Sequence, residues 1–253
     1  MNRLCGMAFF KIFVKEKSVN LEFKKLKKSN STISAMLLMA LLIASCGESP
    51  QKEESNDRRP ASTAEDKKPE EGRKVILFFG NSLTAGYGVK KEQSFPSLIQ
   101  ARIDSLGLNY KVVNAGVSGE TTATGLNRLD WVLDNYEVEI FVLELGANDG
   151  LRGLPPEQTK KNLEKIIDEV RALEPGVEVV LAGMMVPPSM GPEYSAAYNP
   201  IFKEIAESKE VEFIPFLLEG VGGVDSLNQD DGIHPNPAGN RLVRENVWEV
   251  LSP

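Results

Sequence analysis

Histidine and cysteine are almost absent from this chain. His234 is the only histidine among 253 residues, and the two cysteines are Cys5 and Cys46. The chain beyond residue 46 therefore has no disulfide and no cysteine-ligated metal, and zinc sites built from several histidines are excluded. Any chemistry that needs an imidazole must use His234, and the residues imply no metal and no organic cofactor.

The N-terminal part of the chain has no apolar run long enough to span a bilayer. An apolar run from Ile33 to Ala44 follows a lysine-rich stretch, and its twelve residues are too few to span a bilayer as a helix. The run closes on Ile43-Ala44-Ser45-Cys46, which resembles the lipobox of bacterial lipoproteins. An ordinary cleaved signal with an incidental cysteine is the alternative. We expect residues 1–46 to be a lipoprotein signal peptide, with a lipid on Cys46 that anchors the protein in the bacterial cell envelope, facing the periplasm or the cell surface.

The chain also lacks a basic surface. Residues 47–72 are mostly charged or small and polar, which predicts a flexible tether. Residues 1–46 hold eight of the 29 Lys and Arg residues and two of the 36 Asp and Glu residues, so the remainder has 21 basic and 34 acidic side chains, a net charge of −13. Such an acidic chain is not expected to bind nucleic acid.

Alternating apolar runs and helical patterns begin at Lys74. Five runs predict strands: Val75–Phe79, Tyr110–Asn114, Ile140–Glu144, Val177–Ala182 and Val211–Pro215. Helical spacing of apolar residues follows Pro155-Pro156, and a last helix is expected from Pro237 to Leu251. Strand and helix in repeated order indicate an α/β domain over residues 73–253, a three-layer αβα flavodoxin-like fold with a five-stranded parallel sheet.

Ser82 follows the first predicted strand, just past Gly80-Asn81. Open α/β sheets bind their ligands at the carboxyl ends of their strands, which makes this serine a candidate nucleophile. A plain turn residue or a helix cap is the alternative, and the motif alone favours it.

Loops after later strands carry candidate partners for this serine. Asn148 stands in the loop after the third strand, and Gly119 lies in a glycine-rich loop after the second strand. Asp231 precedes His234 by three residues, a spacing at which a carboxylate can accept a hydrogen bond from the ring. Each pattern alone is also typical of an ordinary turn or a surface hydrogen bond.

Taken together, four segments resemble the SGNH (GDSL-type) hydrolase superfamily, and most of all its bacterial thioesterase/arylesterase/lysophospholipase branch. The segments that carry the resemblance are Phe79–Gly88, Val113–Thr121, Glu144–Gly153 and Gln229–Asn236. The resemblance extends from about Lys74 to Leu251, which is nearly the whole of the predicted domain.

The resemblance implies a role for each candidate residue. Ser82 is expected to be the nucleophile, His234 the general base and Asp231 the partner that orients it. The amides of Ser82 and Gly119 and the side chain of Asn148 are expected to form the oxyanion hole. The superfamily usually has Asp where this chain has Asn81, which accepts the same hydrogen bonds without a charge. The segment Leu145–Gly153, which includes Leu151, resembles one that moves when substrate binds.

A loop rich in methionine and proline follows the fourth predicted strand, from Gly183 to Tyr194. It should overhang the same edge of the sheet as Ser82. Met184, Met185 and Tyr194 are candidates for an adaptable apolar wall that holds an acyl chain. The alternative is that these side chains only pack the loop together.

We therefore expect a serine esterase that hydrolyses acyl esters or thioesters through a Ser-His-Asp triad and an acyl-enzyme. One alternative is a carbohydrate O-deacetylase of the same fold. Trp131 and Trp248, the only tryptophans, fall in segments that read as helix and core instead of a sugar platform. The other alternative is a non-catalytic binding lipoprotein, against which the complete set of four polar candidates argues.

Overall fold

The computed structural model of this chain describes residues 72–252. The expected signal peptide, Cys46 and nearly all of the expected tether lie outside the described residues, so those expectations remain predictions. Within residues 72–252 no helix is both long and apolar enough to cross a membrane.

Strands and helices alternate through the described residues. Their bounds, with the single-turn 3₁₀ helices written η, are β1 (Lys74–Gly80), α1 (Ser82–Ala85), η1 (Lys91–Gln93), α2 (Phe95–Ser105), β2 (Tyr110–Gly116), α3 (Thr122–Leu133), β3 (Val138–Glu144), α4 (Ala147–Leu151), α5 (Pro156–Leu173), β4 (Glu178–Ala182), η2 (Pro188–Met190), α6 (Pro192–Tyr198), α7 (Ile201–Lys209), β5 (Glu212–Ile214), η3 (Asp225–Leu227) and α8 (Pro237–Leu251).

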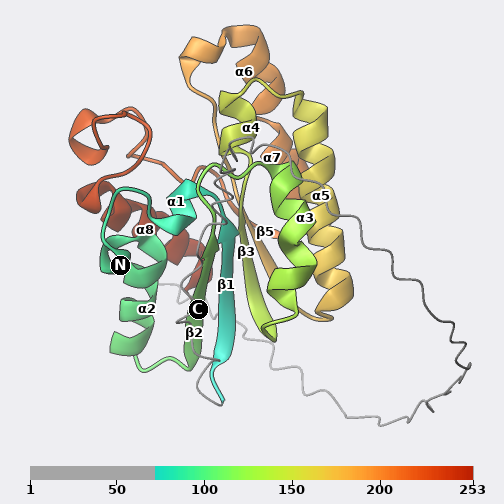
Figure 1. Ribbon diagram of the computed structural model, residues 1–253, viewed down its shortest axis with the longest axis vertical. Helices are drawn as coiled ribbons and strands as arrows, with labels where there is room; N and C mark the ends of the chain where they lie inside the picture. Colours follow the sequence, from blue (N-terminus) through green and yellow to red (C-terminus); the bar gives the residue numbers. More distant parts are fainter. Residues whose placement is uncertain (1–71, 253) are drawn as a thin grey trace, which may run out of the picture. The chain divides into compact units, whose positions relative to one another are not determined.

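The five strands form one parallel sheet in the order β2-β1-β3-β4-β5. Helices α2 and α8 pack together on one face, and α3, α5 and α7 form the layer on the other face (Figure 1). This is the flavodoxin-like strand order, so the predicted fold is confirmed. All five predicted strands are present, with ends that differ by at most two residues.

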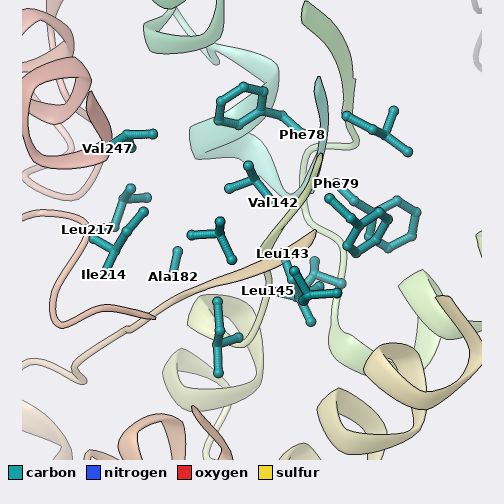
Figure 2. Packing of buried hydrophobic residues seen from close by; sticks show 14 of the residues in the cluster. Phe78, Phe79, Val142, Leu143, Leu145, Ala182, Ile214, Leu217 and Val247 are labelled. Carbon is teal, nitrogen blue, oxygen red and sulfur yellow. The ribbon is translucent and has the colours of Figure 1, made fainter. Parts of the chain in front are cut away.

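The core lies between these layers, because each buried strand sends alternate side chains to opposite faces of the sheet. Phe78 packs edge-on against Phe95 of α2, with ring centroids 5.5 Å apart. Its neighbour Phe79 points to the other face (Figure 2). There its ring packs against that of Phe141, with centroids 5.5 Å apart. All four rings are fully buried. Such two-sided burial explains why β1 reads as an unbroken apolar run.

Two predicted loops contain short helices. Helix α4 lies inside the segment that was expected to be a loop after β3, and α6 lies at the end of the methionine-rich loop. Pro192 occupies the first turn of α6, where its missing N–H costs no hydrogen bond. Both helices lie at the carboxyl edge of the sheet, as does α1 (Figure 1).

Candidate active site

Ser82 is the first residue of α1, and only Asn81 separates it from the end of β1. The side chain of Asn81 caps this helix by accepting a hydrogen bond from Leu83 N at 3.0 Å. The cap fixes the turn in which Ser82 stands, and a first helical residue has no partner for its N–H within the helix. The cap of this helix is therefore Asn81, and the alternative interpretation of Ser82 as the cap is wrong.

His234 and Asp231 come together with Ser82 at this edge. The imidazole Nε2 lies 2.8 Å from Ser82 Oγ, and Nδ1 lies 2.7 Å from Asp231 Oδ2. The other carboxylate oxygen, Oδ1, accepts hydrogen bonds from the main-chain N–H groups of His234 and Ile233, both at 3.0 Å. Asp231 therefore stabilises the turn that leads to His234 as well as contacting its imidazole ring.

The charge of Asp231 follows from these contacts. Burial alone would raise its pKa, but the hydrogen bonds from His234 and Ile233 outweigh burial and lower the pKa to about 2. The carboxylate is therefore an acceptor at neutral pH, so Nδ1 carries the hydrogen and Nε2 is free to accept one from Ser82.

Gln229 ties the histidine turn to the loop that follows Ser82. Its Nε2 donates to the main-chain oxygen of Tyr87 at 2.8 Å, and its main-chain N–H donates to the oxygen of His234 at 2.8 Å. The ring of Tyr87 lies against the imidazole, with centroids 4.7 Å apart. The contact between Ser82 and His234 is thereby supported on both sides, by contacts that no sequence motif predicts.

Asn148 lies in α4, and its Nδ2 donates to the main-chain oxygen of Glu120 at 2.9 Å. An amide has two N–H groups, so this bond aims the side chain and leaves one donor for a ligand. The neighbouring Asp149 is buried and accepts hydrogen bonds from Thr122 N at 2.9 Å and Thr122 Oγ1 at 2.5 Å. These contacts hold α4 against the start of α3.

Gly119 lies in the loop between β2 and α3 with a φ of +81°, which favours glycine. Its main-chain oxygen accepts a hydrogen bond from Arg152 at 2.9 Å. A second arginine, Arg128, pairs with the buried Glu120 and donates to Ala115 O at 2.8 Å. Together the two arginines hold the Gly119 loop over the ends of the strands. Arg128 was not predicted as a functional residue, because no sequence motif links an arginine in α3 to Glu120 in the loop before this helix.

A cavity of about 820 Å³ opens beside Ser82, His234 and Asn148, all three of which line it. Apart from His234, no Asp, Glu, Lys or Arg and no other ionisable side chain of the described residues lines the cavity. One wall is the methionine- and proline-rich segment, as predicted. The other wall comes from the segment after β5 and includes Phe216, Leu218 and Ile233, which were not predicted from the sequence.

The four predicted substrate contacts do not share one position. Leu151, Met184 and Met185 line the cavity; Met184 is buried, whereas Leu151 and Met185 are partly exposed. Tyr194 is not among the lining residues. Its ring stacks on Tyr198, and its hydroxyl donates to Leu154 O at 2.6 Å, so it packs the loop, in agreement with the alternative interpretation.

Within residues 72–252 there is no group of three or more His, Cys, Asp or Glu side chains that could hold a metal ion. The polar groups at the cavity are instead a hydroxyl, an imidazole backed by a carboxylate, and amide donors. This arrangement can transfer a proton from an alcohol and stabilise negative charge on oxygen.

Residues 78–242 match the sequence profile of the GDSL-like Lipase/Acylhydrolase family, which covers well over half of the chain. The chain belongs to this family. The superfamily predicted from the four sequence segments is therefore confirmed, as is the prediction of an ester hydrolase.

Curated relatives within this family are similar over most of their length. Esterase TesA of Pseudomonas aeruginosa is 41% identical over 179 residues, which cover 71% of this chain and 88% of the relative. Arylesterase of Vibrio mimicus is 39% identical over 176 residues, with 70% and 87% covered. Thioesterase 1/protease 1/lysophospholipase L1 of Escherichia coli K12 is 34% identical over 179 residues, with 71% and 84% covered.

Solved structures of this hydrolase family have the same fold. A crystal structure of TesA superposes with a TM-score of 0.68 at 40% identity and covers 71% of this chain and 99% of its own. The psychrotrophic esterase EstA from Pseudoalteromonas sp., solved with monoethylphosphonate as inhibitor, gives a TM-score of 0.66 at 33% identity, with 70% and 96% covered.

Proposed function

We propose that this family member hydrolyses carboxylic esters and thioesters through an acyl-enzyme formed on Ser82. The observation that carries the proposal is the line of contacts from Asp231 Oδ2 through His234 to Ser82 Oγ, at 2.7 and 2.8 Å. The names of the relatives, esterase, arylesterase and thioesterase, support acyl esters and thioesters as the substrate class.

In the first half of the reaction, Ser82 Oγ attacks the acyl carbonyl carbon while its proton passes to His234 Nε2. The carboxylate of Asp231 stabilises the imidazolium that forms. The carbonyl electron pair moves onto oxygen, where the N–H groups of Ser82 and Gly119 and the Nδ2 group of Asn148 stabilise the charge.

When the tetrahedral intermediate collapses, the bond to the leaving oxygen or sulfur breaks and His234 returns the proton to that atom. Water then attacks the acyl-enzyme, again giving its proton to Nε2. The acid is released and the Ser82 hydroxyl is restored, so the cycle needs no cofactor.

The substrate's acyl group is assigned to the wall that contains Met184 and Met185. Unbranched methionine side chains adapt to chains of different shape, and an apolar wall favours several methylenes over a single methyl group. Apart from His234, the described cavity residues include no acidic or basic side chain, which favours a neutral acyl chain. We therefore propose medium-chain esters or thioesters over acetyl esters.

The two tryptophans give the carbohydrate deacetylase no support. Trp131 is exposed on α3, and Trp248 packs against the core with the guanidinium of Arg102 over its ring at 4.7 Å. Neither side chain is among those that line the cavity. Neither tryptophan therefore forms a sugar platform beside Ser82, and the binding-lipoprotein alternative leaves the contact between Ser82 and His234 without a role.

We further propose that the protein is anchored to the bacterial envelope by a lipid on Cys46. The support is in the sequence alone: a short apolar run ends at this cysteine, and an acidic, polar stretch of about 26 residues separates it from the domain. The anchor would hold the active site near a membrane while leaving the domain free to move.

A serine-reactive fluorophosphonate tests the nucleophile directly. The probe should label the wild-type protein and fail to label Ser82→Ala, in which kcat should fall by about 10⁴-fold or more. Ser195→Ala is the matched control, because Ser195 also lines the cavity but donates its hydroxyl hydrogen to Gly191 O at 2.9 Å. Labelling of Ser82→Ala at the wild-type rate would refute the assignment.

A further inference from the structure

A fully buried carboxylate lies directly behind the nucleophile turn. Glu144, the last residue of β3, has no exposed surface. Its Oε1 accepts a hydrogen bond from Asn81 Nδ2 at 2.7 Å. Its Oε2 accepts three more: Asn81 N at 3.1 Å, Thr84 N at 3.2 Å and Thr84 Oγ1 at 2.7 Å. The four donors come from the two residues that flank Ser82 and Leu83 in the chain.

The bond to Oε1 determines which way the Asn81 amide faces. With Nδ2 held by Glu144, the amide oxygen Oδ1 must face the other side, where it accepts from Leu83 N at 3.0 Å and lies 3.4 Å from Ser82 Oγ. A reversed amide would place its NH₂ group against Leu83 N–H and remove the cap of α1. The orientation of this amide therefore depends on an acceptor at Glu144.

The space behind the turn is closed. A Cβ added to Gly80 would lie 2.6 Å from Glu144 Oε2 and would collide with Thr84 Oγ1. The carboxylate occupies the room that a side chain at Gly80 would need, so the turn cannot relax by moving toward the sheet.

We propose that Glu144 and Asn81 form a matched acceptor–donor pair that positions Ser82, with Glu144 as a positioning residue that reaches the nucleophile through the Asn81 amide. The pair places its one negative charge behind the turn and keeps a neutral amide beside the serine. The kinetic part of this inference rests on the proposed role of Ser82 as nucleophile.

The pH of the test follows from the same contacts. Burial raises the pKa of Glu144 to about 7, and the hydrogen bonds from Thr84 and Asn81 prevent a larger rise. At pH 8.5 Glu144 is therefore ionised, and all four donors meet an acceptor.

Exchanging the two functional groups tests the pairing. In Glu144→Gln, the amide oxygen can replace Oε2, but its NH₂ group then faces Asn81 Nδ2, donor against donor. In Asn81→Asp, two buried carboxyl groups lie within hydrogen-bond distance and must share a proton. The double variant Asn81→Asp/Glu144→Gln restores a donor–acceptor pair in the opposite sense. The introduced glutamine amide would donate to the introduced carboxylate, whose second oxygen would still accept from Leu83 N.

The experiment measures kcat and KM on a p-nitrophenyl ester at pH 8.5 for the wild type, both single variants and the double variant. Misplacing a reacting group by about 1 Å costs roughly 10²-fold in rate. We expect Glu144→Gln to lose about 10²-fold in kcat with KM within about threefold of wild type, and the double variant to return to within about tenfold of wild type. Glu178→Gln, the same change at the exposed start of β4, is the matched control and should keep wild-type kinetics.

A urea titration of the same four proteins reads the pairing without using activity. The single variants should unfold at lower urea than the wild type, and the double variant should recover most of the difference. A double variant no more stable and no more active than the weaker single variant would overturn the proposal, as would Glu144→Gln with wild-type kcat. Recovery of stability without recovery of kcat would retain the pair but overturn its positioning role. Wild-type activity in Ser82→Ala would instead refute the nucleophile, which separates the two failures.

Discussion

The Nε2 atom of His234 lies 2.8 Å from the Oγ atom of Ser82, although 152 residues separate them in the chain. The contact arises because Ser82 follows β1, which lies between β2 and β3 in the sheet, and His234 precedes α8, which packs on α2, the helix whose Phe95 contacts Phe78 of β1. Gln229 then links the two loops by hydrogen bonds to Tyr87 and His234. The active-site geometry therefore depends on how the strands, helices and loops of the whole domain pack together.

Removing the charge of Asp231 should slow the reaction strongly without unfolding the domain. In Asp231→Asn the side chain can donate where the carboxylate accepts, which favours the wrong tautomer of His234, so kcat should fall by up to about 10⁴-fold. The measurement is kcat on a p-nitrophenyl ester with circular dichroism as the folding check. Loss of less than about tenfold would show that the ring is oriented by other contacts.

The pH dependence of the wild type should report Glu144 and not Asp231. The pKa of Asp231 is lowered from 3.8 to about 2 in the folded protein. The ionised carboxylate therefore stabilises the folded state above about pH 4, and this stabilisation is lost as the pH falls toward 2. Between pH 5 and 9 this carboxylate does not titrate. Glu144 does titrate in this range, because burial raises its pKa to about 7. The kcat of the wild type should therefore fall as the pH is lowered through this value, and a kcat–pH profile of Glu144→Gln should lack this limb.

Asn148→Ala should lower kcat by about 10²–10³-fold with little change in KM, because the charge that its amide stabilises develops only in the transition state. Steady-state kinetics on one ester measures both constants. Asn199→Ala provides the comparison: Asn199 lines the same cavity, but its Oδ1 accepts from Val186 N at 3.0 Å, so its loss should act through the wall and change KM. An effect of Asn148→Ala confined to KM would point to ground-state binding.

A series of p-nitrophenyl esters should show kcat/KM rising from acetyl toward medium chains. Each methylene buried against the apolar wall adds about 0.8 kcal/mol, or roughly fourfold in kcat/KM. Met185→Ala should flatten this rise, whereas Leu173→Ala, a similarly exposed position on α5 away from the cavity, should leave it unchanged. A sharp preference for acetate, with activity on acetylated sugars, would favour the carbohydrate deacetylase instead.

Cys46→Ser should abolish labelling by a fatty-acid probe and leave the precursor uncleaved or mislocalised. The reason is that lipid attachment requires the thiol, and no other cysteine follows the apolar run. Metabolic labelling in a bacterial host followed by membrane fractionation measures both effects, and Cys5→Ser serves as the control. Unchanged labelling in Cys46→Ser would refute the anchor.

The fold and the main polar residues could be predicted from the sequence because each has a local signature. An unbroken apolar run ending in glycine predicts β1, and Asp231 three residues before the only histidine predicts their contact. Glu144 was missed as a functional residue although it is the last residue of a predicted strand. Its four hydrogen-bond donors belong to Asn81 and Thr84, which are far from it in the sequence and come close only in the folded structure. The cavity wall at Phe216, Leu218 and Ile233 was missed for a related reason: it follows from sheet order and not from any spacing in the chain.

The two walls of the cavity have different relations to the residues that react. The wall at Phe216 and Ile233 belongs to the stretch of chain that carries Asp231 and His234, so an insertion there would disturb the triad geometry. The wall at Met184 and Met185 belongs to the segment that follows β4, and it contains none of the proposed triad or oxyanion residues. Changes of substrate preference among natural variants should therefore concentrate in this second wall.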